Sequence, residues 1–531
     1  MDINICARKA LDLLAQSAAL RGEKRLEEAL GRLEEASSIY PGFLPILVEK
    51  GIVMFESGRF EEAIACFEQI LKKSGNPQVQ KLRDMCLGHV LADCDRMVGE
   101  CRENVEALLK RADILQRLRR NEEAVRDYNA ALGIRVNEVA AIFNRRSNAL
   151  LDLDRPEEAL EGYSRALGFL PCNGSLLFNR ANVLQKLARM DEAAADYDRA
   201  LEVRPDLAEA KMERSHCRLA LGDFERGFYE YESRWETAQL QAVPSGSPQP
   251  LWLGKENLAG KTILLWAEQG YGDTIQFLRY VALVARSAGK TVLRTPPGLV
   301  ALAKSLDCPV SVISTNEAMP AHDFHCPLMS LPLALGTRLE TIPADIPYLG
   351  ADSGRVEKWR KRLGARSRPV IGLAWAGRRR HPVNHSRDMR LEMLAPLTRF
   401  DVDIISLQKE VPEEDGPALQ SMPRIERFGE ELSDFAETAA LLENLDLVIG
   451  VDSVVAHLAG ALGKPVFILL RYSGEWRWLL GRADSPWYPT ARLFRQKVPG
   501  DWAGVVSEIM REVKKTVVRT KEKSLQGLID N

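Results

Sequence analysis

The chain has 531 residues, of which 46% are hydrophobic and 27% charged; this is the composition of a folded globular protein and excludes a disordered or fibrous one. At about 150 residues per domain, the length predicts three or four compact units. The 72 Lys and Arg residues nearly balance the 74 Asp and Glu residues, so the formal charge of −2 excludes an overall electrostatic attraction to nucleic acid.

Neither a membrane span nor a secretory signal is expected. The longest uncharged stretch, 237–254, is interrupted by Pro244, Pro248 and Pro250, which indicates a linker. The first 20 residues carry Asp2 and lack a basic segment followed by an apolar one. The nine cysteines form no CxxC pair, which favours reduced thiols and a cytoplasmic location. No ligand spacing supports a metal site.

The first half of the chain repeats itself with a period of 34 or 35 residues. Alanine recurs at positions 29, 63, 124, 159 and 193, and glycine continues the series at 227. A small residue lies 12 positions before each of these sites, and a large one, mostly tyrosine, lies four positions after. Two helices that cross closely need a small side chain at the crossing and a bulky one beside it, so the pattern predicts stacked helical pairs.

These residues resemble the tetratricopeptide repeat over about residues 8–236, and we take 1–236 as the repeat domain. The gap from 63 to 124 is seven short of two periods, so the unit near 76–104 is expected to be irregular. The resemblance implies an α-solenoid, a superhelix whose concave face holds a polypeptide. The candidate acceptor-binding residues on the first helices of the repeats are Asn144, Asn148, Asn179 and Asn182.

After a Pro-rich linker, 237–257, short β-branched runs alternate with helical ones. Strands are expected at 262–267, 291–294, 310–314, 370–375, 402–407, 445–451 and 466–470, with helices over 273–288, 391–400, 434–442 and 453–462. Asp434 and Glu437 resemble a capping box at one helix start. The alternation predicts two Rossmann-like parallel sheets, 258–355 and 366–500, facing each other across a cleft, with a closing helix and tail at 501–531. The fold class is therefore α + α/β.

Three motif-like strings do not support a site. The stretch from Gly254 to Thr262 has five residues between its glycines, where a phosphate loop has four, and it precedes its strand. Gly270-Tyr271-Gly272 lacks the third glycine of a dinucleotide fingerprint, so NAD binding is weakly supported. Asp401-Val402-Asp403 spells the acidic pair of metal-dependent sugar transferases, but it leads into a strand, which favours a solvated strand start.

The first segment that can carry chemistry follows the first strand. It runs from Glu268 to Gln276 and contains Gly270, Gly272 and Asp273. The two glycines allow a tight turn and a close approach of the backbone to a ligand. An Asp at a helix start is a helix cap worth ~1 kcal/mol, or else a carboxylate placed to take a proton from an acceptor hydroxyl.

Two further segments can hold an anion. Asp452-Ser453 opens a helix after the strand 445–451, where free backbone N–H groups and the positive end of the dipole attract a diphosphate, and His457 lies one turn further on. The loop after the strand 370–375 contains several arginines, of which Arg387 lies nearest the next helix and would neutralise phosphate charge. For Arg378, Arg379 and Arg380 a solvated basic loop is favoured.

Together these segments resemble glycosyltransferase family 9, the heptosyltransferase-like enzymes with the two-lobed GT-B fold, over about residues 251–513. The stretches that carry the resemblance include His325-Cys326-Pro327-Leu328, Trp476-Arg477-Trp478-Leu479 and Trp487-Tyr488-Pro489. The resemblance implies that Asp273, after Gly272, is the catalytic base and that Asp452, Ser453 and His457 grip the donor diphosphate. The heptosyltransferases carry a glycine after the Ser or Thr, where this chain has Val454.

The resemblance implies an inverting, metal-independent transferase that uses a nucleotide-diphosphate sugar as a substrate and needs no cofactor. The layout resembles O-linked GlcNAc transferase in architecture, so a protein acceptor presented by the repeats is expected, with a flagellin-like protein as a candidate. Two alternatives stay open. The chain is a scaffold that has lost catalysis, as Val454 suggests, or it is an enzyme of envelope polysaccharide biosynthesis whose repeats serve assembly.

Overall fold

The computed structural model describes residues 3–134, 138–237, 247–377 and 387–529. The chain forms two compact units, Met1–Arg180 and Ala181–Asn531. Part of the expected linker and the basic loop containing Arg378, Arg379 and Arg380 lie outside the described residues. None of the described helices combines the length and apolar character that crossing a bilayer requires.

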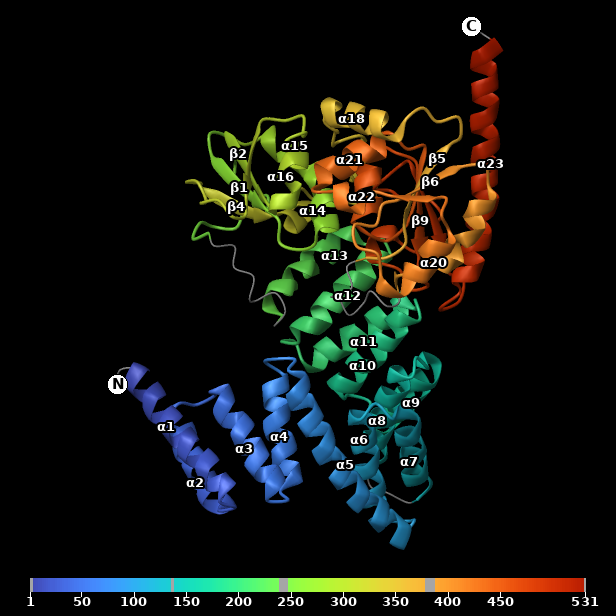
Figure 1. The fold of residues 1–531 in the computed structure, drawn as a ribbon. Helices are drawn as coiled ribbons and strands as arrows, with labels where there is room; N and C mark the ends of the chain where they lie inside the picture. Colours follow the sequence, from blue (N-terminus) through green and yellow to red (C-terminus); the bar gives the residue numbers. More distant parts are fainter. Residues whose placement is uncertain (1–2, 135–137, 238–246, 378–386, 530–531) are drawn as a thin grey trace. The chain divides into compact units, whose positions relative to one another are not determined.

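The first half of the chain is built of antiparallel helical pairs, coloured blue to green in Figure 1. The helices are α1 (Ile3–Gly22), α2 (Leu26–Ile39), α3 (Leu44–Glu56), α4 (Phe60–Leu71), α5 (Pro77–Glu100), α6 (Val105–Arg117), α7 (Asn121–Gly133), α8 (Val139–Asp152), α9 (Pro156–Phe169), α10 (Gly174–Lys186), α11 (Met190–Val203), α12 (Ala208–Ala220) and α13 (Phe224–Tyr231). The α-solenoid predicted for this half is confirmed.

Packing at the helix crossings follows the small-and-large pattern of the sequence. The repeat alanines at 29, 63, 124, 159 and 193 are fully buried. A Cβ atom at Gly51 would lie 2.5 Å from the ring of Phe67, and one at Gly162 would lie 2.2 Å from the Ser147 hydroxyl. Since no larger side chain fits at such a crossing, the spacing of small residues in the sequence fixes how each pair packs.

The expected irregular unit is one long helix. α5 has 24 residues and packs against both α4 and α6, where the regular pattern would have a further helical pair. It starts at a cap in which Asn76 Oδ1 accepts the Gln78 N–H at 2.9 Å. Asn104 caps α6 in the same way through the Ala107 N–H.

The first α/β lobe has a parallel sheet of order β3-β2-β1-β4. Its strands are β1 (Thr262–Trp266), β2 (Lys290–Thr295), β3 (Val310–Ser314) and β4 (Phe324–Pro327), with helices α14 (Tyr271–Phe277), α15 (Val281–Ala285), α16 (Pro297–Ala303) and α17 (Leu331–Ala334). The expected single helix 273–288 is wrong, since the short turn η2 (Leu278–Tyr280) separates α14 from α15. The carbonyls of Ile275 and Gln276 there accept hydrogen bonds from side chains.

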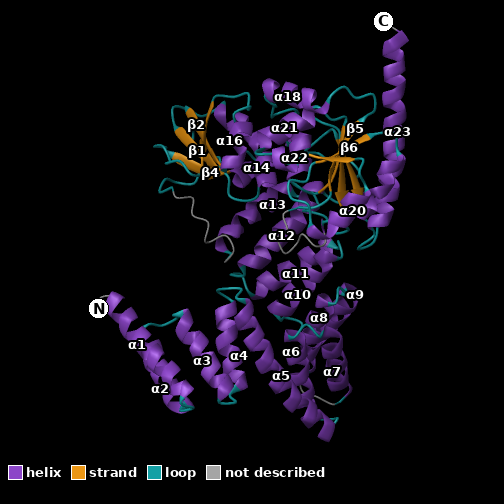
Figure 2. Cartoon of the chain, in the orientation of Figure 1, coloured by secondary structure: helices purple, strands orange, loops and turns teal. Residues whose placement is uncertain are grey.

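The second lobe has a parallel sheet of order β10-β9-β8-β5-β6-β7. Its strands are β5 (Val370–Ala374), β6 (Asp403–Ser406), β7 (Ile425–Arg427), β8 (Leu447–Val451), β9 (Val466–Leu470) and β10 (Ala491–Arg495). The helices are α18 (Ser353–Leu363), α20 (Gly416–Ser421), α21 (Phe435–Glu443), α22 (Val454–Ala461) and α23 (Trp502–Ile529). Figure 2 shows the two groups of strands with α14, α16, α21 and α22 between them.

Two local expectations for this lobe need correction. The α-helix expected at 391–400 is the 3-10 helix η5 (Leu391–Arg399), because Pro396 lies inside it and has no N–H to donate. Asp434 caps α21 by accepting the Glu437 N–H at 2.7 Å, as predicted. The Glu437 carboxylate, however, pairs with arginine and lysine on α18 and does not return to the backbone, so only half of a capping box forms.

Candidate active site

The loop between β1 and α14 places Asp273 one turn into a helix. Gly270 is the residue that precedes α14, and Asp273 Oδ2 accepts its backbone N–H at 3.0 Å. Asp273 therefore caps the helix from inside the first turn, where its charge also complements the helix dipole. Its side chain is 24% exposed, so part of it is open to solvent.

A buried arginine of the second lobe holds the other oxygen of this carboxylate. Arg477 Nη2 donates to Asp273 Oδ1 at 2.5 Å, and Arg477 Nε donates to the Gln276 side-chain oxygen at 2.7 Å. Arg477 also pairs with Glu475, and its guanidinium lies 4.5 Å from the ring centroid of Trp476. The contact ties the two lobes together at the residue expected to act as the base.

The turn after β8 forms the second part of the site. Ser453 precedes α22 with an extended backbone, and its side chain makes no capping hydrogen bond. The Ser453 hydroxyl oxygen is buried and has no hydrogen-bond partner among the described residues. The first N–H groups of α22 have no acceptor within the helix, so this tip offers several donors to an anion.

His457 is a buried packing residue of α22. Its side chain is 6% exposed, its ring stacks on Trp478, and its Nδ1 lies 3.0 Å from the Tyr488 hydroxyl. Its Nε2 lies 3.8 Å from Asp452 Oδ1. Burial lowers the pKa of His457 well below its ordinary value, with nearby arginines adding to the effect, so the ring is neutral at pH 7. Burial raises the pKa of Asp452.

Gly272 lets the two helices touch. A Cβ atom at Gly272 would lie 3.0 Å from His457 Cδ2 and 3.6 Å from the Val454 Cα. α14 of the first lobe and α22 of the second thus pack directly against each other, which brings Asp273 close to the tip of α22. Because Gly272 has no side chain, its Cα faces the His457 ring directly, and this allows the two helices to approach each other closely.

Arg387 lies on the other side of the α22 tip, after β5. The place of a Cβ on Gly377 is taken by the Arg387 guanidinium, with Nη2 only 2.2 Å away. The charge of Arg387 adds to the lowering of the His457 pKa, and it opposes the burial that raises the pKa of Asp452. Arg387 is therefore within electrostatic reach of the tip of α22.

The last repeat helix anchors the loop that carries Asp273. Arg234, just after α13, is fully buried and contacts both oxygens of Glu268 at 3.1 Å. The Gln269 side chain donates to the Tyr231 hydroxyl at 3.0 Å. Burial raises the pKa of Glu268 to about 7 while Arg234 opposes the shift. The loop between β1 and α14 is thus held by residues of the repeat array.

Neither Arg234 nor Arg477 could be singled out from the sequence. Arg477 is part of a tryptophan-rich stretch in the family resemblance, yet its partner Asp273 is 204 residues away. Arg234 lies 34 residues from Glu268 in the sequence and belongs to no recognisable motif. The only available signal was an arginine among aromatic residues, which is typical of a buried and stacked guanidinium. Asp403, by contrast, opens β6 as expected, but it is buried and pairs with Arg368 at 2.7 Å, so the prediction of a solvated strand start is wrong for this residue.

The asparagines proposed for the repeats make contacts within the array. Asn148 accepts a hydrogen bond from the Tyr163 hydroxyl, and Asn182 accepts one from Tyr197, each at 2.5 Å. Asn179 donates to Asn144 at 3.1 Å. All four are half-buried, so they are partly accessible, but their side-chain oxygens or amides already serve the packing between helices.

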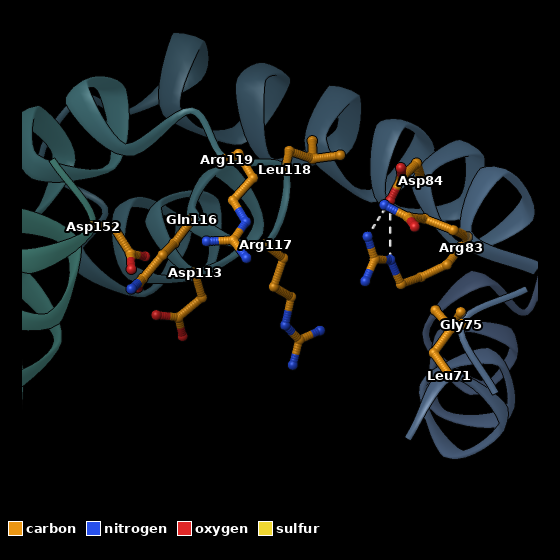
Figure 3. A pocket seen from close by; sticks show the side chains of 11 residues that line it. Leu71, Gly75, Arg83, Asp84, Asp113, Gln116, Arg117, Leu118, Arg119 and Asp152 are labelled. Atoms are coloured by element: carbon orange, nitrogen blue, oxygen red, sulfur yellow. Dashed lines mark hydrogen bonds and ion pairs between the residues drawn. The ribbon is translucent and has the colours of Figure 1, made fainter. Parts of the chain in front are cut away.

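A polar cavity of about 680 Å³ lies in the first unit, beside the irregular helix α5. Figure 3 shows Arg117 and Arg119 with Asp113 and Asp152 along one side, and Arg83 turned toward Asp84 on the other. Asp113 is engaged by the Tyr128 hydroxyl at 2.6 Å and by Arg145. The cavity presents charges of both signs.

Family models match both halves of the chain. Residues 20–86, 109–171 and 178–245 match tetratricopeptide repeat models, and residues 433–497 match the model of glycosyltransferase family 9 (heptosyltransferase). The second match covers α21 to β10 and includes the tip of α22. The chain is therefore a fusion of tetratricopeptide repeats with a glycosyltransferase family 9 domain, which makes it a glycosyltransferase-like protein. The repeats indicate an interaction with other proteins.

One curated relative matches most of the chain. Protein FlbA of Caulobacter vibrioides (strain ATCC 19089 / CIP 103742 / CB 15) is 26% identical over 440 residues, which cover 77% of this chain and 72% of FlbA. Among solved structures, MamA is 15% identical over 36% of this chain and 96% of its own, with a TM-score of 0.26. YrrB, described as a TPR protein with an unusual peptide-binding site, is 15% identical over 38% of this chain and 91% of its own, with a TM-score of 0.25.

Proposed function

We propose that this glycosyltransferase moves a sugar from a nucleotide-diphosphate donor to a hydroxyl of a protein acceptor, with inversion at the anomeric carbon and without a metal ion. One observation carries the proposal. Asp273, on α14 of one lobe, lies beside the tip of α22 of the other lobe, because Gly272 packs against His457. A carboxylate next to an anion-binding helix tip is what transfer from a diphosphate donor requires.

The donor diphosphate would bind at the tip of α22. The free N–H groups of the first turn and the Ser453 hydroxyl donate to its oxygens, and Arg387 supplies positive charge from the side of β5. These donors meet the negative charge that develops when the bond from the anomeric carbon to the phosphate oxygen breaks. The neutral, buried ring of His457 packs against Gly272 and holds α14 in contact with α22.

Asp273 would accept the proton of the acceptor hydroxyl. The acceptor oxygen attacks the anomeric carbon from the face opposite to the diphosphate, which leaves with the bonding electron pair. A carboxylate has about four lone-pair positions, and the contacts with Gly270 and Arg477 use two of them. The exposed part of Asp273 is therefore available to the acceptor.

The acceptor would be a protein segment held by the repeats. The cavity beside α5 offers arginines and carboxylates to the backbone and side chains of an extended polypeptide. A flagellin-like protein is the first acceptor to test, as the family resemblance suggests.

A panel of nucleotide-diphosphate sugars tests this function. The donor is expected to raise the thermal unfolding midpoint of the full chain and to release the nucleoside diphosphate when an acceptor is added. Absence of binding by every nucleotide-diphosphate sugar and nucleoside diphosphate in the panel would rule the proposal out.

A scaffold that binds a partner without catalysis is the second candidate. It is favoured by the fact that both oxygens of Asp273 already have structural partners, Gly270 and Arg477. Donor binding without hydrolysis or transfer to any acceptor would support this candidate.

A further inference from the structure

Arg234 joins two carboxylates at the point where the repeat array meets the first lobe. Its Nη1 donates to Glu232 Oε1 at 2.7 Å, and its Nη2 lies 3.1 Å from both oxygens of Glu268. Arg234 is completely buried, and the side chains of Glu232 and Glu268 are 18% and 1% exposed. The guanidinium also donates to the Tyr231 carbonyl and to the Ser330 hydroxyl, so it holds the end of α13 and the loop after β1 together.

Two carboxylates on one guanidinium leave an excess negative charge inside the protein. A buried charge without a counter-ion costs stability, and the uptake of one proton from solvent removes that cost. The surroundings favour Glu268 as the site of the proton. Glu232 is more exposed and accepts a further hydrogen bond from the Ser330 hydroxyl at 2.7 Å, whereas the donors to Glu268 among the described residues come from Arg234 alone. The carboxylate with more burial and fewer donors is the one that protonates first.

The charged and titratable groups around this pair come from four parts of the chain. They are Glu232 next to Arg234, Tyr231 at the end of α13, Asp273 on α14 and Cys326 on β4, and Arg477 acts in turn on Tyr231. Burial raises the pKa of Glu268 to about 7, with Glu232 and Asp273 adding to the rise and Arg234 opposing it. Burial also raises the pKa of Tyr231 and of Cys326, so both stay neutral at pH 7.

A short stretch of chain, fixed at each step, links Glu268 to Asp273. Gln269 donates its side-chain N–H to the Tyr231 hydroxyl at 3.0 Å. Gly270 donates its backbone N–H to Asp273 Oδ2 at 3.0 Å. A change in the contact between Arg234 and Glu268 is therefore passed along a few residues to the Asp273 carboxylate.

We propose that Glu268 is a positioning residue that exchanges a proton with solvent near neutral pH: its ionised form holds the loop between β1 and α14 through Arg234, and its protonated form releases that loop. Ionised Glu268 forms an ion pair with a fully buried arginine, and protonation removes the charge on which this pair depends. The proton binding is independent of the proposed function. The positioning of Asp273 for transfer rests on the proposed function.

Infrared difference spectroscopy of the full chain between pH 5.5 and 8.5 tests the proton binding. In wild type, the band of a protonated carboxyl group is expected to disappear as the pH rises through about 7, and Glu268→Gln should lack this change. Glu232→Gln leaves one carboxylate on Arg234, so the midpoint should move to lower pH. The matched control is Glu225→Gln, which breaks an exposed ion pair between α13 and Arg338 of the first lobe and should follow wild type.

Two results of this titration would overturn the inference. The first is a wild-type spectrum without a carboxyl change in this range, which needs no variant to be read. The second is a change that persists in Glu268→Gln and vanishes in Glu232→Gln, because the proton would then belong to Glu232.

Turnover against pH tests the positioning role. With a donor and an acceptor, kcat of wild type is expected to rise as Glu268 ionises. Glu268→Gln is expected to lower kcat at pH 8 by about tenfold or more and to remove the rise near pH 7, because a displaced base loses the geometry that transfer needs. KM for the donor should change by about twofold or less, since the proposed donor site lies on α22. Glu225→Gln should keep the wild-type profile.

The outcomes separate the positioning role from the function on which it rests. If wild type transfers a sugar and Glu268→Gln lowers kcat equally at every pH, Glu268 is a structural residue and the positioning role is overturned while the proposed function stands. An unchanged kcat in Glu268→Gln overturns it as well. If wild type neither binds nor transfers a nucleotide-diphosphate sugar, the proposed function itself fails, and the infrared titration still decides the proton binding of Glu268.

Discussion

The carboxylate of Asp273 meets a backbone N–H from its own turn and a guanidinium from the other lobe. Both contacts orient the side chain, and the Arg477 guanidinium also stabilises its charged form. An orienting environment suits a base that must point at an acceptor hydroxyl, but it also suits a purely structural residue. Only a change that keeps the shape and removes the charge separates these two roles.

Asp273→Asn is expected to lower sugar transfer by about 10²-fold to 10⁴-fold, because the amide cannot accept the acceptor proton. Donor affinity should stay within about threefold, since the phosphate donors lie on α22. Turnover and calorimetric donor binding measure the two effects. The control is Asp352→Asn, which alters a similar cap on α18 and should leave turnover unchanged. Full turnover in Asp273→Asn would assign Asp273 to structure alone.

His457 makes the stability of the second unit depend on pH. Burial lowers its pKa in the folded chain well below the value of about 6.5 in the unfolded chain. Below pH 6.5 the unfolded state therefore binds a proton that the folded state does not. The contribution of His457 to the free energy of unfolding is expected to fall by about 1.4 kcal/mol per pH unit as the pH drops below 6.5, while Glu268, whose pKa is raised to about 7, contributes in the opposite direction.

Thermal unfolding between pH 5.5 and 7.5 measures this dependence. The stability difference between wild type and His457→Asn should shift in favour of the variant as the pH drops below 6.5, because the variant lacks the His457 contribution, whereas the exposed-site variant His89→Asn should follow the wild-type curve. Equal slopes in wild type and His457→Asn would contradict the assignment of the pH dependence to His457.

At the scale of elements, the site depends on contact between α14 and α22. The space between them is too small for a side chain at Gly272, because a Cβ would lie 3.0 Å from the His457 ring. The His457 ring cannot move easily, since Trp478 stacks on it and the Tyr488 hydroxyl forms a hydrogen bond with its Nδ1. The close approach of the two helices is what joins the two halves of the site.

Gly272→Ala is therefore expected to destabilise the second unit by about 1–3 kcal/mol and to weaken turnover through the shifted helix. Chemical denaturation and turnover check the two effects. The control is Gly416→Ala at the start of α20, where a Cβ meets no atom within 4 Å and should be neutral or slightly stabilising. A neutral Gly272→Ala would mean that the helices can separate without cost.

Across the whole molecule, the repeat array does not end where the α/β lobes begin. α13 belongs to the second compact unit, and its Phe224 and Phe228 rings pack against Trp476, while Phe224 also stacks on Trp487. Arg234 is buried against the loop that carries Asp273. The end of the repeats is therefore part of the core of the transferase.

A fragment of residues 181–531 is expected to fold cooperatively, whereas a fragment of 258–531 is expected to aggregate or to lack fixed tertiary packing. The shorter fragment exposes the aromatic surface that α13 covers and leaves Glu268 buried without its arginine. Near-UV circular dichroism and thermal unfolding compare the two fragments. Equally cooperative unfolding of both would contradict this account of the domain boundary.

The sequence predicted the features that depend on neighbours in the chain. The spacing of alanine and tyrosine predicted the helical pairs, and alternating apolar runs predicted most strands of both sheets. It missed the short strands β4, β7 and β10, which have three to five residues and little pattern of their own. Pro396 was a visible signal against the expected α-helix.

Part of the candidate site was also predictable from neighbouring residues in the chain. Asp273, Asp452 and Ser453 follow strands directly, so their place at a sheet edge could be inferred from order in the chain. Arg477 could not, because its contact with Asp273 joins positions 204 residues apart and follows no spacing rule. The structure was also needed to place the ring of His457 between Trp478 and Tyr488.

A crystal structure of the full chain with the nucleoside diphosphate that binds it would test the proposed active site most directly. We expect a phosphate on the Ser453 hydroxyl and the first N–H groups of α22, with the Asp273 carboxylate facing the position of the departed sugar. A diphosphate bound away from α22, or one from which Asp273 is screened by protein, would rule this site out.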